Sequence, residues 1–195
     1  YGFVAPDMAL QRYTEADRSL PARYARAIAL YRKGALGSAL LTIDGLLKEH
    51  PNDPYFHELR AQMLYENGRA AESIPSYRRA VQLAPAAAIL KIDLARALLD
   101  VTNPDNTREA MRNLNLASQQ ESGNFELWRL MAAGYSSLGD QGMTSLARAE
   151  MAAIRGLRAE AQSHAEAASR QLTAGTPAWQ RAQDLKAYIN TRPRK

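Results

Sequence analysis

The sequence predicts an all-α solenoid of about ten helices, in which each helix packs mainly against its chain neighbours. Three observations favour this class. Ala, Leu and Arg are plentiful and aromatic residues make up only 7% of the chain, a composition typical of helices. Glycines and prolines recur at a fixed interval. The chain has no cysteine, so no disulfide framework can replace a packed core.

The interval between the recurring residues is 34. Gly34 and Gly68 are 34 residues apart, and so are Pro51 and Pro85. Each interval holds two helical patterns, with the glycine at the turn between them and the proline after the second helix. A 34-residue unit of two helices is the signature of the tetratricopeptide repeat (TPR). We therefore expect a TPR-like α-solenoid, a right-handed superhelix.

The segments follow from this period in order. The first 18 residues show no helical periodicity, and we expect an extended leader. Four helical pairs follow, then a degenerate unit that turns at Gly156, and a last helix that covers the open end of the stack. The expected boundaries are 1–18 for the leader, 19–175 for the repeats (20–53, 54–87, 88–124, 125–156 and a degenerate 157–175), and 176–195 for the capping helix and basic tail.

Helix boundaries carry their own signals. Asp53 precedes Pro54, and Ser19 and Thr176 each stand close before a proline, so we expect these three residues to cap helix N-termini. In the third repeat, "VTNPDNT" (101–107) predicts a few extra residues at the turn between its two helices.

Large side chains are expected to set the angle between helices in the fourth repeat and to cover the C-terminal end of the stack. Trp128 and Tyr135 hold positions 4 and 11 of the fourth repeat, where large side chains set the angle between helices. Trp179, Leu185 and Ile189 are expected to cover the C-terminal end of the stack.

The net charge of +5 comes from the C-terminal end of the chain. Residues 1–150 hold 17 Lys and Arg against 17 Asp and Glu, whereas residues 151–195 hold 8 against 3. The repeats therefore lack the continuous basic track of a nucleic-acid-binding protein, and no nucleic acid partner is expected. No apolar run approaches the roughly 20 residues that span a bilayer, so no membrane span is expected either.

The first helix of each pair lines the concave side of such a superhelix, and five positions of that helix face the groove. In this sequence those positions are aromatic at one end, apolar in the middle and polar at the other end. Tyrosines combine contact area with a hydroxyl, so we predict a protein or peptide partner, unless these tyrosines only pack against the next repeat or the leader. The predicted groove residues are Tyr24, Ile28, Tyr31, Arg32, Tyr55, Glu58, Gln62, Tyr65, Glu66, Ile92, Arg96 and Arg129.

One stretch resembles a zinc site without forming one. In "PYFHELRAQ" (54–62), His57 and Glu58 form the first half of the motif H-E-x-x-H, but the position of the second histidine holds Ala61. A zinc site needs at least three protein ligands, and only two other histidines are present. We expect no catalytic residue, metal or cofactor in this chain, and we expect His57 to pack between helices.

Three stretches carry a wider resemblance: "NDPYFHEL", "ENGRAAESIPSYRRAV" and "GTPAWQRAQDL". With them, residues 19–85, 138–156 and 175–185 resemble the C-terminal TPR half of bacterial periplasmic zinc metalloproteases of the β-barrel-assembly-enhancing protease type. The resemblance implies that zinc and its H-E-x-x-H helix lie in a separate N-terminal domain, outside this sequence. It also implies a periplasmic zinc metalloendopeptidase whose repeats contact the protease domain, unfolded clients and the outer-membrane assembly machinery.

The residues leave two other possibilities open. The chain could be a free-standing TPR adaptor in the cytoplasm, with no protease partner. It could also self-associate through the groove or the leader, because Phe3, Val4 and Met8 are apolar residues without a predicted partner.

Overall fold

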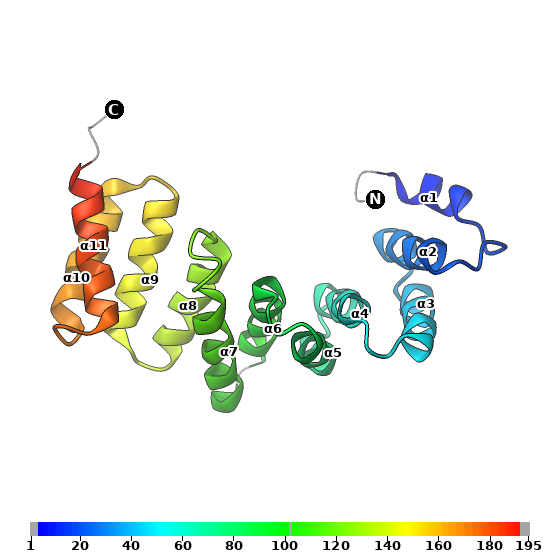
Figure 1. Ribbon diagram of the computed structural model, residues 1–195, viewed down its shortest axis with the longest axis horizontal. Coiled ribbons are helices and arrows are strands. Elements are labelled where there is room, and N and C mark those ends of the chain that lie inside the picture. The colour runs from blue at the N-terminus through cyan, green and yellow to red at the C-terminus, as the bar shows by residue number, and fades with distance from the viewer. Residues whose placement is uncertain (1–3, 102, 192–195) are drawn as a thin grey trace. The chain divides into compact units, whose positions relative to one another are not determined.

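The computed structural model describes residues 4–101 and 103–191, and these residues form eleven α-helices and no strand (Figure 1). The predicted all-α, TPR-like solenoid is confirmed. The helices are α1 (Pro6–Arg12), α2 (Leu20–Arg32), α3 (Leu36–Glu49), α4 (Pro54–Glu66), α5 (Ala70–Leu83), α6 (Ala88–Asp100), α7 (Pro104–Ala117), α8 (Phe125–Ser137), α9 (Gln141–Ile154), α10 (Arg158–Gln171) and α11 (Pro177–Thr191).

The four helical pairs share one design. Their first helices have 13 residues each and their second helices 14. In three of them the turn contains a glycine in the left-handed region, namely Gly34 (φ 79°), Gly68 (φ 75°) and Gly139 (φ 76°). Residues with a Cβ are strained at such φ values, so glycine is required for this reversal.

The third repeat has extra residues, as predicted, but the predicted position of these residues is wrong. Asn103 is an N-cap whose Oδ1 accepts from the Asp105 backbone N–H at 2.8 Å, and Pro104 begins α7 at once. The turn before α7 is therefore as short as the others. Leu114 lies 68 residues, or two repeat lengths, after Leu46 and is fully buried like it. The extra residues lie after α7, where residues 118–124 connect α7 to α8.

The predicted N-caps are confirmed. The hydroxyl of Ser19 accepts from the backbone N–H of Ala22 at 3.4 Å, and that of Thr176 accepts from Trp179 at 3.3 Å. The Asp53 carboxylate accepts from two backbone N–H groups at the start of α4, at 2.9 and 3.2 Å. Each cap satisfies donors that the first helical turn leaves without a partner.

The prediction of an extended leader is wrong for part of that segment, because Pro6–Arg12 forms α1. Pro6 lies in the first turn, where proline favours a helix, and Asp7 and Arg12 complement the two ends of the helix dipole. Seven residues are too few for a periodic pattern to stand out in the sequence. Phe3, the side chain of Ile189 and most of the basic tail lie outside the described residues.

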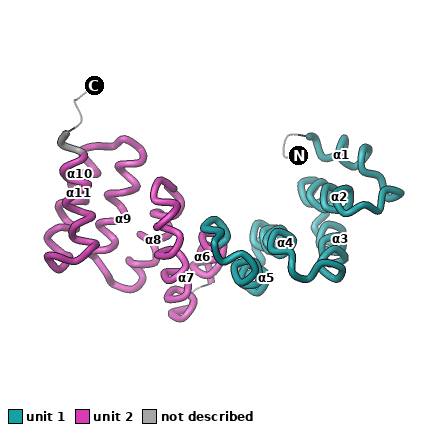
Figure 2. The backbone as a smooth tube through the Cα atoms, viewed as in Figure 1, with its two compact units in different colours: residues 1–90 teal, residues 91–195 magenta. Residues whose placement is uncertain are grey.

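The chain forms two compact units, residues 1–90 and residues 91–195 (Figure 2). In the first unit, each of α1 to α4 packs against the next helix, around a core that includes Ala27, Ile43 and Met63, all fully buried. In the second unit, α7 to α11 pack in the same sequential way, and α11 also contacts α9. Its core is built largely from small residues such as Ala149 and Ala161, which let helices approach closely.

Candidate protein-binding surface

Helices α2 and α4 bring three predicted groove residues into one hydrogen-bonded group. The hydroxyl of Tyr31 donates to Oε2 of Glu66, and the Gln62 amide donates to Oε1 of Glu66 at 2.8 Å. Burial, followed by the hydrogen bond to Glu66, raises the pKa of Tyr31 above its ordinary value. The carboxylate is thus fixed by donors from two successive repeats.

The tyrosines around this group differ in role. Tyr24 packs against Phe56, with ring centroids 5.4 Å apart, and burial raises the pKa of Tyr24, with Glu58 and Asp53 adding to the effect. It is therefore largely a packing residue. Tyr55 is 57% exposed on α4. The sequence could not separate these two roles, because both residues occupy groove positions of the repeat.

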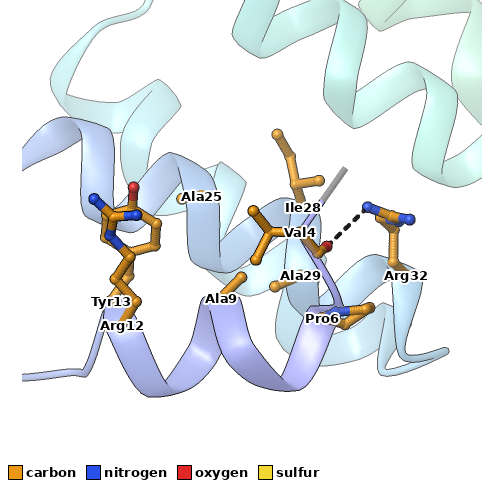
Figure 3. Close-up of a pocket in the computed structure, with 9 residues that line it drawn as sticks. All are labelled: Val4, Pro6, Ala9, Arg12, Tyr13, Ala25, Ile28, Ala29 and Arg32. Atoms are coloured by element: carbon orange, nitrogen blue, oxygen red, sulfur yellow. Dashed lines mark hydrogen bonds between the residues drawn. The ribbon is translucent and has the colours of Figure 1, made fainter. Parts of the chain in front are cut away.

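Ile28 and Arg32 lie on another face of α2, toward α1. They line a pocket of about 340 Å³ between α1 and α2 (Figure 3). In the close-up, Val4, Ile28 and Ala29 lie in its middle, and the Arg32 guanidinium donates to the carbonyl of Val4 at 3.4 Å. The remaining lining residues are Pro6, Ala9, Arg12, Tyr13 and Ala25.

The predicted residues of the second unit divide into one core residue and two ion-paired arginines. Ile92 is fully buried, so its prediction as a groove residue is wrong; its apolar side chain is core. Glu126 pairs with Arg129 at 2.6 Å and with Arg96 at 3.1 Å, and Arg96 also pairs with Asp93 at 3.0 Å. Arg129, and then Arg96, lower the pKa of Glu126 below its ordinary value. These arginines are therefore balanced by acidic neighbours.

One feature of the second unit was not predicted. Arg148 and Met151 of α9 join Arg129, Ser136 and other residues of α8 around a shallow pocket of about 470 Å³. The groove rule considers only the first helix of each pair, so it passed over α9. The pattern of two helices joined by a short turn predicts that α9 packs against α8, and this signal could have led to the residues of α9.

His57 makes a local contact at the start of α4, and its packing between helices stays a prediction. Its Nε2 lies 2.9 Å from the Pro51 carbonyl oxygen, which ties the start of α4 to the preceding turn. Within residues 4–101 and 103–191, no three His, Asp or Glu residues lie close enough to hold a metal ion. No helix in the described part of the chain is long and apolar enough to cross a bilayer.

The repeated helical pairs define a helical-repeat solenoid. Residues 24–88 match the model of the tetratricopeptide repeat family. Among solved structures, MamA is similar with a TM-score of 0.63 and 18% identity, over 84% of this chain and 92% of MamA. YrrB, described as a TPR protein with an unusual peptide-binding site, gives 0.52 and 16%, over 97% and 86%. A TPR protein of Thermus thermophilus gives 0.50 and 16%, over 96% and 98%. At these identities the likeness concerns the fold.

Proposed function

We propose that this chain is a protein–protein interaction module that binds a peptide or a partner helix at the Tyr31–Glu66 surface, which comprises Tyr31, Tyr55, Gln62, Tyr65 and Glu66. The observation that carries the proposal is the hydrogen-bonded group of Tyr31, Gln62 and Glu66, together with the exposed Tyr55 on the same helix as Gln62 and Glu66. A TPR fold, and the peptide-binding site named for YrrB, support the same class of function.

The chemistry of this surface favours a partner segment that donates hydrogen bonds. Glu66 is an acceptor held in place before a ligand arrives, so binding costs little side-chain entropy. Tyrosine rings attract cations over their faces, and carboxylates bind Lys and Arg side chains strongly. A segment with a basic side chain next to apolar residues therefore fits this surface best.

This surface is tested by selecting peptides from a display library on the wild-type chain and measuring their affinity for variants. Glu66→Gln keeps the shape but removes the charge, and it should weaken a selected basic peptide by about tenfold. Tyr31→Phe should weaken it less. Tyr135→Phe is the matched control, because its hydroxyl bonds Asn115 in the second unit at 3.0 Å. Equal affinities for wild type and Glu66→Gln contradict the proposed surface.

We further propose that the chain is the non-catalytic C-terminal half of a periplasmic zinc metalloendopeptidase. The support is the resemblance of residues 19–85, 138–156 and 175–185 to that group of repeat domains. In this setting zinc belongs to an N-terminal domain, and the Tyr31–Glu66 surface receives clients, the protease domain or the outer-membrane assembly machinery. A free-standing cytoplasmic adaptor fits the fold equally well.

Fractionation of the source cells, followed by an immunoblot against this chain, separates the two settings. A periplasmic band well above the 21.5 kDa of this sequence is expected for the protease. A cytoplasmic band near 21.5 kDa identifies the adaptor and contradicts the protease.

A further inference from the structure

Helix α1 covers one face of α2 without filling the space between them. The face of α2 consists of Ala25, Ile28, Ala29 and Arg32, which are spaced as one side of a helix. Opposite this face, α1 presents the small side chain of Ala9 (Figure 3). A pocket of about 340 Å³ remains between the two helices, and Val4, Pro6, Ala9, Arg12 and Tyr13 line it from the side of α1.

Few contacts hold α1 in place. None of its residues is buried, and an isolated helix of this length is marginal in water. Asp7 pairs with Lys33 at 2.5 Å, but both side chains are exposed, so the pair contributes little. The Arg32 bond to the Val4 carbonyl, at 3.4 Å, is long for a hydrogen bond.

The connection after α1 is held much better than α1 itself. Arg26 donates to the carbonyl oxygens of Thr14 at 2.5 Å and Asp17 at 2.7 Å, and Ser19 caps α2. Because these hydrogen bonds hold the connection on α2, α1 can dissociate from α2 without unfolding it. The connection also fixes the direction of α1: Tyr13 follows α1 near the start of α2, and Asp7 lies beside Lys33, directly after the end of α2.

We propose that this face of α2 is a second protein-binding site, and that α1 occupies it in the free chain. The partner is an amphipathic helix that runs antiparallel to α2. It carries an acidic residue in its first turn, where α1 has Asp7, and a large apolar residue where α1 has Ala9. This site is separate from the Tyr31–Glu66 surface.

Both parts of the partner's description follow from the site. A large apolar side chain opposite Ile28 and Ala29 fills the pocket and gains the contacts that Ala9 leaves unmade. An acidic residue in the first turn pairs with Lys33 and is also stabilised by the positive end of its own helix dipole. A partner helix longer than α1 covers more of α2.

The test uses the full chain and a fluorophore on α1. Because the chain has no cysteine, Met8→Cys places one dye on α1 at a position that is 64% exposed. The probe is a stapled peptide with the sequence of residues 4–13 and Ala9→Leu. It should displace α1, so the fluorescence anisotropy of the dye falls. The same peptide with Asp7→Lys as well should bind about threefold more weakly.

Two controls make the outcome decisive. The same dye at Leu116→Cys, which is 52% exposed on α7, should not respond to the peptide. Placing Ala9→Leu in the chain itself should fill the pocket from within and weaken binding of the peptide by up to about fivefold. An unchanged anisotropy with saturating peptide overturns the proposal, and so does equal binding of the two peptides. A dimer with exchanged α1 helices, detected by sedimentation, also overturns it, because the occupant is then a second copy.

Discussion

Each unit of the molecule holds a carboxylate between two first helices of its repeats, but the partners differ. Glu66 in the first unit accepts from the neutral groups of Tyr31 and Gln62, whereas Glu126 in the second is paired with Arg96 and Arg129. In the first arrangement neutral donors leave the negative charge of Glu66 available to a ligand. In the second, the two arginines neutralise the charge of Glu126. Carboxylates on the first helices of repeats are thus held by neutral donors in one unit and by arginines in the other, and only the first arrangement suits the recognition role proposed for it.

The two end helices differ in the same sense. α11 is fastened by Arg181, which pairs at 2.5 Å with Glu150, whose side chain is only 5% exposed, and by Ala182, which is fully buried. The indole N–H of Trp179 also donates to the Ser169 carbonyl at 3.2 Å. α1 has no buried residue. Helix α11 is therefore fixed by a buried ion pair and a buried side chain, whereas α1 packs on α2 through few contacts.

The largest effect should come from breaking the fastening of α11. Arg181→Met leaves the buried Glu150 carboxylate without its partner and should lower the free energy of unfolding of the second unit by about 2–3 kcal/mol. Urea denaturation measures this. Because Arg181 itself is half exposed, the estimate lies below that for a fully buried pair. A change below about 0.5 kcal/mol would mean that α11 is no better held than α1.

The same substitution at both ends should have opposite signs. Ala182→Leu overpacks a fully buried position and should destabilise the chain by about 1–3 kcal/mol. Ala9→Leu fills the pocket beneath α1 and should stabilise the chain by up to about 1 kcal/mol. Thermal unfolding of the two variants is the measurement. Equal losses of stability at both ends contradict the difference between them.

A smaller effect separates the two carboxylates. The folded pKa of Glu126 is depressed, so its contribution to stability is present above the unfolded pKa and is lost as pH falls through the folded pKa. Glu126→Gln should therefore cost about 1 kcal/mol at neutral pH and clearly less at an acid pH below the ordinary pKa of glutamate. Urea titrations at both pH values test this. A loss that does not depend on pH would assign Glu126 a packing role instead.

The smallest effect is expected at α1. Asp7→Asn removes an exposed ion pair and should cost a few tenths of a kcal/mol. Hydrogen exchange should show faster exchange in α1 and unchanged exchange in α2, because Arg26 still holds the connection. Faster exchange in both helices would show that they open together.

Much of the fold could be predicted because glycine and proline punctuate it. Gly34 and Gly68 mark turns that require positive φ, and Asp53 marks a cap, so helix boundaries followed from backbone chemistry. α1 was not predicted because a short helix depends on its tertiary contacts. Asn103 was assigned to a long turn because capping and turn residues are chemically alike.

The candidate site was less predictable than the fold. The repeat positions correctly brought Tyr31 near Glu66, because neighbouring first helices pack side by side. They could not reveal that Ile92 is core or that Ile28 lies beneath α1, since both depend on which helix covers a given face. Arg148 lies on a helix that the groove rule does not include.

The connection between α7 and α8 has a practical consequence. Its residues Gln119 and Gln120 are exposed, while Ser122 further along is tied to Trp128 by a hydrogen bond of 2.7 Å. A peptide bond near Gln119 can therefore be cut, or a reporter domain inserted there, without disturbing a helix.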